Sequence, residues 1–190
     1  MRSLIILVLS LCIVPVLAQD TVTLKPYTDK GFGFTSVIPD GWQDTGNGLY
    51  ERAESATDVT VILQQSISAS PDTIMTSLLP RLGLTQAPES IGTYQSTAFK
   101  WTLYKVDFQT ATITIVVDLA LTEDTTSGKT IFVSLQTSFD EYAMLHKTVF
   151  LPVLDSLTSY VEPVAAGLPF NFHRLFLSIV NIVRRLLSFL

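Results

Sequence analysis

Apolar and polar residues alternate in the middle of this chain, and this pattern constrains its fold more than any other feature. Residues 113–121 carry an apolar side chain at every second position, and residues 59–67 and 131–135 follow nearly the same pattern. A period of two is typical of a β-strand with one buried face, whereas an amphipathic helix repeats every ~3.6 residues. The pattern therefore predicts strands at these three places, each with one face in the core.

Other segments extend the predicted sheet. Residues 99–108 are also rich in apolar side chains, but their apolar positions change parity near Leu103. Such a change indicates either a bulge or a strand that is buried on both faces. Residues 32–38 and 49–52 are shorter candidates. The links between the later strands, such as residues 123–129, are short and polar, and they predict antiparallel neighbours.

Two helices interrupt the strands. Ser70 and Pro71 form a helix start, with Ser70 as the N-cap, and Pro80 ends that helix early. Ser138 and Glu141 fit a capping box, in which each side chain satisfies a free backbone N–H of the other residue. An apolar stripe of helical spacing follows, and Pro152 is expected to bend it: the stripe consists of Tyr142, Leu145, Val149, Val153 and Leu157. These elements predict an α+β domain, an antiparallel β-sheet packed by helices.

The first 18 residues predict export. Arg2 precedes the apolar run 4–14, and residues 16–18 supply the small-residue pattern that a signal peptidase cuts. The run is about half of the ~20 residues that cross a bilayer, so a cleaved signal peptide is favoured over a permanent anchor. The only cysteine, Cys12, lies inside this signal in a context that disfavours lipidation. The mature chain is then cysteine-free, which excludes disulfides and thiolate sites.

Charge divides the rest of the chain in two. Residues 19–163, the expected α+β domain, hold eight Lys and Arg and all seventeen Asp and Glu, for a net charge of −9. Residues 164–190 hold three Arg and no acid. An acidic domain repels phosphate backbones, so we expect no nucleic-acid partner. A short basic, apolar tail is instead typical of a protein that rests on a membrane.

Residues 164–190 are predicted to be a linker and an amphipathic C-terminal helix. In residues 168–190, fourteen of twenty-three side chains are large and apolar, and the polar ones form one narrow helical stripe. The longest stretch without charge, residues 175–183, is too short to span a bilayer. Contact with a membrane surface satisfies both sides of such a helix, while docking on the domain itself or on a partner helix remains an alternative. The expected contact residues are Arg174, Phe176, Ile179, Val183, Arg184, Arg185 and Leu187.

No catalytic, metal or cofactor site is predicted. Ser127–Thr130 imitates the end of a phosphate-binding loop, but Glu123 stands where that loop needs glycine, so we expect a hairpin turn. The mature chain has two histidines, His146 and His173, at a spacing that does not suggest a ligand pair. A small hydrolase that uses His146 as its base remains an alternative.

Trp42 and Tyr50 could form an aromatic platform for a ligand, because both combine a large rigid ring with a polar atom. The competing interpretation, which we favour, is a turn whose Trp packs on the sheet. Nothing in the sequence identifies the ligand.

The order of these signals over residues 27–160 resembles the PsbP-like fold family, including the DcrB-type exported bacterial proteins. The matching features are Gly31-Phe32-Gly33-Phe34, the turn Ile38-Pro39-Asp40-Gly41-Trp42, a strand–helix unit at residues 57–82 and the closing helix at residues 150–157. The resemblance implies a binding or assembly module without a shared catalytic centre. The sequence thus predicts an exported, non-enzymatic accessory domain, associated with the outer face of a membrane through its C-terminal helix. A subunit that docks by its tail into an envelope complex is a further alternative.

Overall fold

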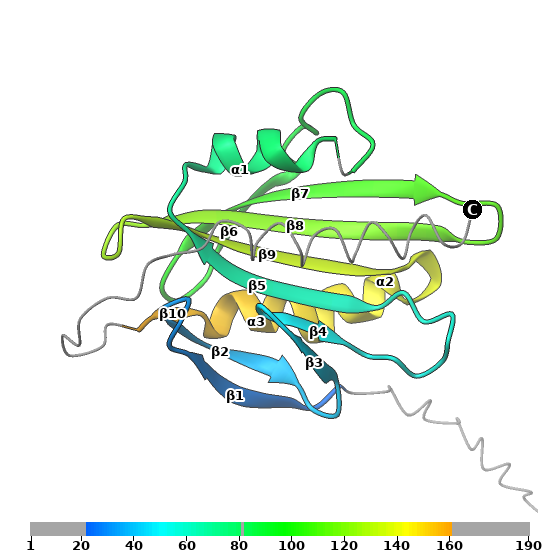
Figure 1. The fold of residues 1–190 in the computed structure, drawn as a ribbon, viewed down its shortest axis with the longest axis horizontal. Coiled ribbons are helices and arrows are strands. Elements are labelled where there is room, and N and C mark those ends of the chain that lie inside the picture. The colour runs from blue at the N-terminus through cyan, green and yellow to red at the C-terminus, as the bar shows by residue number, and fades with distance from the viewer. Residues whose placement is uncertain (1–21, 81, 161–190) are drawn as a thin grey trace, which may run out of the picture.

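Two antiparallel sheets form the frame of the computed structural model, which describes residues 22–80 and 82–160. The large sheet has the strand order β3-β4-β5-β9-β8-β7-β6, and the small sheet has the order β1-β2-β10 (Figure 1). The strands of the large sheet are β3 (Gln43–Gly46), β4 (Leu49–Glu51), β5 (Val61–Ile67), β6 (Gly92–Gln95), β7 (Lys100–Gln109), β8 (Thr114–Asp124) and β9 (Lys129–Ser138). Those of the small sheet are β1 (Leu24–Asp29), β2 (Phe34–Pro39) and β10 (Thr158–Ser159). The α+β expectation is confirmed.

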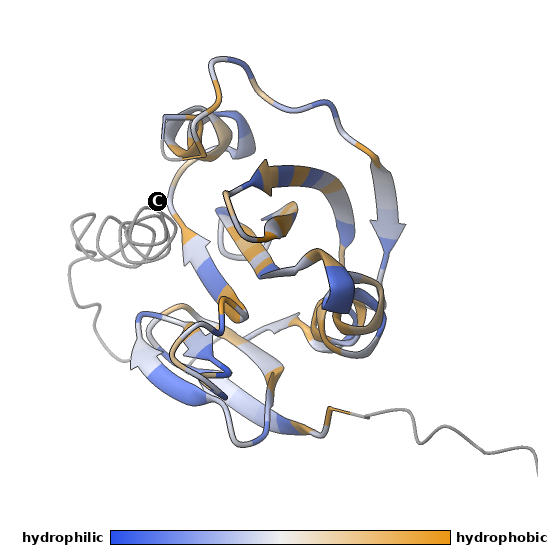
Figure 2. Ribbon diagram, turned by 90° about the vertical axis from the view of Figure 1, so that its right-hand side faces the viewer, coloured by the Kyte–Doolittle hydropathy of each residue, from blue (hydrophilic) through white to orange (hydrophobic). Residues whose placement is uncertain are grey.

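Helices lie on both sides of the large sheet (Figure 2). The helix α1 (Pro71–Leu78) packs on one face. On the other face lie the small sheet and a helical stretch made of α2 (Phe139–Leu145), η1 (His146–Phe150) and α3 (Leu151–Ser156). The sheet is therefore the middle layer of the domain.

Because both faces are covered, the central strands are buried on both sides. All seven residues of β5 are buried, and Ile62 and Leu63 belong to different apolar clusters, one on each face. The polar residues of these strands are also enclosed, and Gln64 donates from Nε2 to the backbone oxygen of Val37 in the small sheet, at 2.9 Å. The expectation of one buried face per strand is therefore wrong for β5, and for most of β8 and β9.

The change of parity in β7 comes from burial on both faces and not from a bulge. The register between β7 and β8 runs without a break from Thr102 opposite Leu121 to Gln109 opposite Thr114. Trp101 packs in the cluster on the α2 side of the sheet, and Val106 packs in the cluster on the α1 side. The expected antiparallel pairing of β7, β8 and β9 is confirmed.

The first helix begins as the sequence predicts. Ser70 is the N-cap, its Oγ accepts a hydrogen bond from the N–H of Thr73 at 3.2 Å, and Pro71 is the first helical residue. The helix ends at Leu78, two residues before Pro80. Local cap chemistry is thus enough to set both ends of α1.

The second helical stretch contains a π-helical turn, η1. Here the N–H of Leu151 donates to the oxygen of His146, five residues earlier. Pro152 follows directly, and in a regular α-helix its ring would clash with the carbonyl of Thr148. The wider turn relieves this clash, so the irregularity expected at Pro152 occurs one turn earlier. The predicted stripe is buried at Leu145, Val149, Val153 and Leu157.

The predicted signal peptide (residues 1–18) and C-terminal segment (residues 164–190) lie outside the described residues. Within residues 22–80 and 82–160, no helix is both long and apolar enough to cross a bilayer.

Candidate functional site

A buried carboxylate on β8 meets a histidine on the helical stretch that covers it. Oδ2 of Asp118 lies 2.6 Å from Nδ1 of His146, and its Oδ1 accepts a hydrogen bond from the Tyr142 hydroxyl at 3.2 Å. Asp118 is 1% exposed, whereas the side chain of His146 is 25% exposed. The histidine therefore lies at the surface, and its carboxylate partner lies in the interior.

The elements that carry these residues explain the arrangement. Asp118 points toward α2 because the even-numbered residues of β8 face that side of the sheet, as Ala120 does. His146 is the first residue of η1, and such π turns are frequent at functional sites. Lys105 on β7 lies 4.6 Å above the Tyr142 ring, and burial followed by the Asp118 charge raises the pKa of Tyr142.

A histidine held by a carboxylate at Nδ1 has a fixed tautomer and a fixed ring orientation, and general bases use this arrangement. A hydrolase also needs a nucleophile beside the other ring nitrogen. Among the described residues, the only hydrogen-bond partner of the His146 ring is Asp118, and no serine hydroxyl reaches it. Asp118 can fix the orientation of the His146 ring and the nitrogen that carries its proton, but the residues described here do not complete a catalytic triad.

Sequence reasoning singled out His146 and missed Asp118. The available signal was an acid in the middle of an apolar strand pattern, at residues 113–121. A carboxylate at such a position is almost never fully buried unless it is paired, so Asp118 could have been marked as needing a partner.

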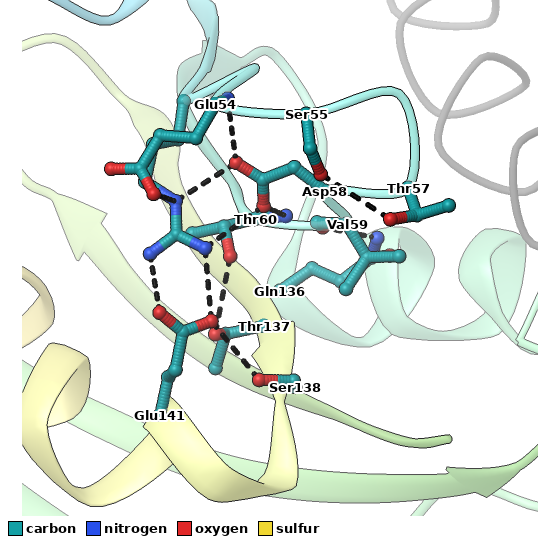
Figure 3. Close-up of polar contacts among 11 residues, drawn as sticks. Glu54, Ser55, Thr57, Asp58, Val59, Thr60, Gln136, Thr137, Ser138 and Glu141 are labelled. Carbon is teal, nitrogen blue, oxygen red and sulfur yellow. Dashed lines mark hydrogen bonds and ion pairs between the residues drawn. The ribbon is translucent and has the colours of Figure 1, made fainter. Parts of the chain in front are cut away.

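A second polar cluster ties the β4–β5 loop to the start of α2 (Figure 3). The Arg52 guanidinium donates to both carboxylate oxygens of Asp58, from Nε at 2.8 Å and from Nη2 at 3.0 Å. It also donates to both oxygens of Glu141, from Nη1 at 2.6 Å and from Nη2 at 2.9 Å. Four of the five N–H groups of the guanidinium donate to these two carboxylates, so the cluster joins the β4–β5 loop to α2.

Both carboxyl groups in this Arg52 cluster are held ionised. Burial on its own would raise the pKa of Asp58, but hydrogen bonds from Arg52 and from the N–H groups of Thr60 and Glu54 outweigh it and lower the pKa to about 2. Hydrogen bonds from Arg52 likewise lower the pKa of Glu141, against the effect of burial. These shifts stabilise the folded state and point to a structural role for the cluster.

The predicted capping box at α2 is wrong in its contacts. Ser138 is the N-cap, but its side chain caps no backbone N–H and instead donates to Oε2 of Glu141 at 3.0 Å. The reason is tertiary, because Glu141 turns toward Arg52, a partner 89 residues away, and not toward its own helix start.

The two residues of the predicted aromatic platform lie in different surroundings. Tyr50 is 2% exposed, and its ring packs edge-on against Tyr27 with 5.7 Å between centroids. Trp42 is partly buried against the same core, at the turn before β3. The Tyr50 ring is therefore enclosed in this structure, whereas Trp42 is only partly buried, and the aromatic platform stays a prediction.

The expected hairpin turn at Ser127–Thr130 is confirmed between β8 and β9, with Gly128 at φ +67°. An open cleft of about 720 Å³ lies beside this β8–β9 hairpin, between β7 and the start of α1. Asp124, which is buried, lines it. Burial would raise the pKa of Asp124, but hydrogen bonds from Ser127 and Ser159 lower it. The cleft is thus formed by the hairpin, α1 and the last described strand.

The remaining predicted site residues belong to the C-terminal segment. Arg174, Phe176, Ile179, Val183, Arg184, Arg185 and Leu187 lie outside the described residues. Over the part of the chain that the structure describes, no group of three or more His, Cys, Asp or Glu side chains is placed to hold a metal ion.

The comparisons with known proteins concern the fold. No protein-family model matches the chain, and no curated protein matches it. Among solved structures, cyanobacterial PsbP (CyanoP) from Synechocystis sp. PCC 6803 is 14% identical over 73% of this chain and 94% of the other, with a TM-score of 0.48. The Ran-binding protein Mog1p of Saccharomyces cerevisiae is 13% identical over 73% and 96%, with a TM-score of 0.49.

A crystal structure from Bacteroides thetaiotaomicron is 16% identical over 80% of this chain and 55% of that chain, with a TM-score of 0.50. The resemblance to the PsbP-like fold is confirmed as a likeness of fold. At these identities the likeness says nothing about activity.

Proposed function

We propose that this chain is an exported, non-enzymatic accessory domain that is held at the outer face of a membrane by residues 168–190. The N-terminal signal supports export. The observation that carries the attachment is the division of charge and hydropathy: all seventeen acids lie in residues 19–163, whereas residues 168–190 combine three Arg with fourteen large apolar residues. A helix of this composition binds at a membrane interface through its apolar side and its Arg side chains.

The described domain supports a binding role over a catalytic one. Its one histidine, His146, is oriented by Asp118 but has no nucleophile beside it among the described residues. Arg52 is paired with both Asp58 and Glu141. Rigid side chains that are paired in this way fit a scaffold that presents a surface to another molecule.

The attachment is tested with vesicles that contain anionic lipid. We expect the mature chain to sediment with them, and we expect the charge reversal Arg184→Glu/Arg185→Glu to weaken binding at least about 30-fold. Each Arg near an anionic surface contributes ~1 kcal/mol, and ~1.4 kcal/mol corresponds to a factor of ten. The measurement is cosedimentation over a range of lipid concentrations at low ionic strength.

The matched control is Lys100→Glu/Lys129→Glu, which makes the same change of charge on the domain itself. We expect this control to bind much more tightly than the tail variant. Equal loss in both variants would show that only net charge matters. Absence of vesicle binding by the unaltered chain would overturn the attachment and favour a subunit that docks on a protein complex.

A further inference from the structure

The large sheet presents an apolar surface on the side where α1 lies, here named the α1-side face. Buried side chains on it come from neighbouring strands, among them Leu63 of β5, Phe132 of β9, Leu119 and Val117 of β8, and Val106 of β7. The strand register confirms that these side chains share a face. Leu119 and Val117 are two positions apart in β8, and they lie opposite residues that are also two positions apart in β7 and in β9. This surface follows nearly the whole length of β8.

The helix α1 accounts for only part of the cover on this face. Eight residues of α-helix rise ~12 Å, whereas the eleven residues of β8 extend ~37 Å. A link of only three residues, Ser68–Ser70, joins α1 to β5, which keeps α1 toward the β8–β9 hairpin (Figure 1). Yet Ile115 and Val117, at the opposite end of β8, are 0% and 3% exposed. The segment that follows α1 adds Leu82 and Leu84 to this apolar cluster, but α1 itself is too short to reach that end of the face.

The described chain ends beside this face. Ser159 of β10 lines the same cleft as Pro71 of α1 and as Tyr104 and Leu121, which belong to the α1-side face. The next segment therefore starts at the hairpin end of the face. Residues 161–167 reach up to ~23 Å, and residues 168–190, as the predicted helix, extend ~34 Å. This length matches that of β8.

The polar groups of the face also match this segment. Gln65 and Gln136 lie on the same face, and their amide oxygens have no hydrogen-bond partner among the described residues. A cover for this face must supply hydrogen-bond donors as well as apolar side chains, and residues 168–190 carry Arg, Asn and Ser beside their apolar side.

We propose that residues 168–190 dock on the α1-side face, beside α1, when no membrane is present. The inference rests on the proposed function in treating this segment as one amphipathic helix, and it adds an intramolecular site for the same apolar side. In the free protein, docking shields the apolar side of residues 168–190 from water. A membrane competes with the sheet for this apolar side.

The test uses the mature chain in buffer without lipid or detergent. Ile179→Asp/Val183→Asp places two charges in the apolar side of the segment, and Ser178→Asp/Asn181→Asp places two in its polar stripe. We expect the first variant to lower the Tm by at least ~5 °C and to increase the fluorescence of the hydrophobic dye ANS several-fold, because the α1-side face becomes accessible. The second variant should leave both nearly unchanged.

The sign of the ANS change separates docking from a free tail. If the segment were exposed, adding charges to its apolar side would reduce dye binding and leave the Tm unchanged, and this result would overturn the proposal. A milder variant, Ile179→Ala/Val183→Ala, should shift both readouts in the same direction to a smaller extent. Light scattering gives the mass of each variant, and an unaltered chain that is dimeric while the Asp variant is monomeric would assign the face to a second copy instead. Vesicle binding is not measured, so this outcome is independent of the proposed attachment.

Discussion

Arg52 shows how a single side chain can connect parts of the chain that are distant in sequence. It joins Asp58, six residues away, to Glu141, 89 residues away. The Arg52 and Asp58 side chains are 13% and 3% exposed, so their hydrogen bonds replace water that is no longer available to them. Glu141 is 35% exposed and contributes less, since solvent screens it.

We predict that Arg52→Gln lowers the free energy of unfolding at pH 7 by about 3 kcal/mol, because it leaves Asp58 buried without its cation. Asp58 and Glu141 have pKa values below their ordinary 3.8 and 4.5, so the stability they supply is complete above those values. It is lost as the pH falls toward the folded-state pKa of Asp58, about 2. The difference between the two proteins should therefore shrink between about pH 4.5 and 2 in urea titrations.

The control for this variant is Lys25→Gln, which removes an ion pair with Asp40 whose side chains are 49% and 58% exposed. Its unfolding should match that of the unaltered chain at every pH. An Arg52→Gln variant that loses the same stability at pH 7 and at pH 2 would contradict the role assigned to the carboxylates.

At the scale of elements, the two helix starts differ in a way that the sequence does not reveal. Both begin with serine, and the pattern at Ser138 is the stronger capping signal. In the structure Ser70 caps Thr73, whereas Ser138 bonds to Glu141, which Arg52 has drawn away. A serine and a glutamate at a helix start form a capping box only when neither side chain has a stronger hydrogen-bond partner elsewhere in the fold.

We predict that Ser70→Ala destabilises the domain by about 1 kcal/mol, the usual cost of a lost N-cap. Ser138→Ala should cost only about 0.5 kcal/mol, the lower end for a single hydrogen bond, because Glu141 keeps its bonds from Arg52. Chemical denaturation of both variants at pH 7 gives the comparison. Equal losses, or a larger loss for Ser138→Ala, would mean that the capping box forms in solution.

At the scale of the whole molecule, the large sheet is a middle layer with a core on each side. Ile62 and Leu63 are neighbours in β5 and face opposite clusters, with exposures of 0% and 1%. A sheet with one solvent-exposed face would bury only one of these two side chains.

We predict that Ile62→Ala and Leu63→Ala each lower the free energy of unfolding by about 2–5 kcal/mol, the cost of a cavity in a packed core. Thr93→Ala, on the exposed edge strand β6, should change it by less than about 0.5 kcal/mol. Thermal unfolding of the three variants measures this. A small effect of Leu63→Ala beside a large effect of Ile62→Ala would show that the α1-side face is open to water.

The sequence by itself determined the local elements: the positions of the main strands, the β8–β9 hairpin, the N-cap of α1 and the buried stripe from Leu145 to Leu157. These depend on side-chain periodicity and turn chemistry, which involve residues close together in the chain. Only the tertiary structure decided that β5 pairs with β9, that both faces of the sheet are covered, that Tyr50 lies in the core, and that Asp118 meets His146. Each of these depends on which distant segments stack on one another, and no local pattern carries that information.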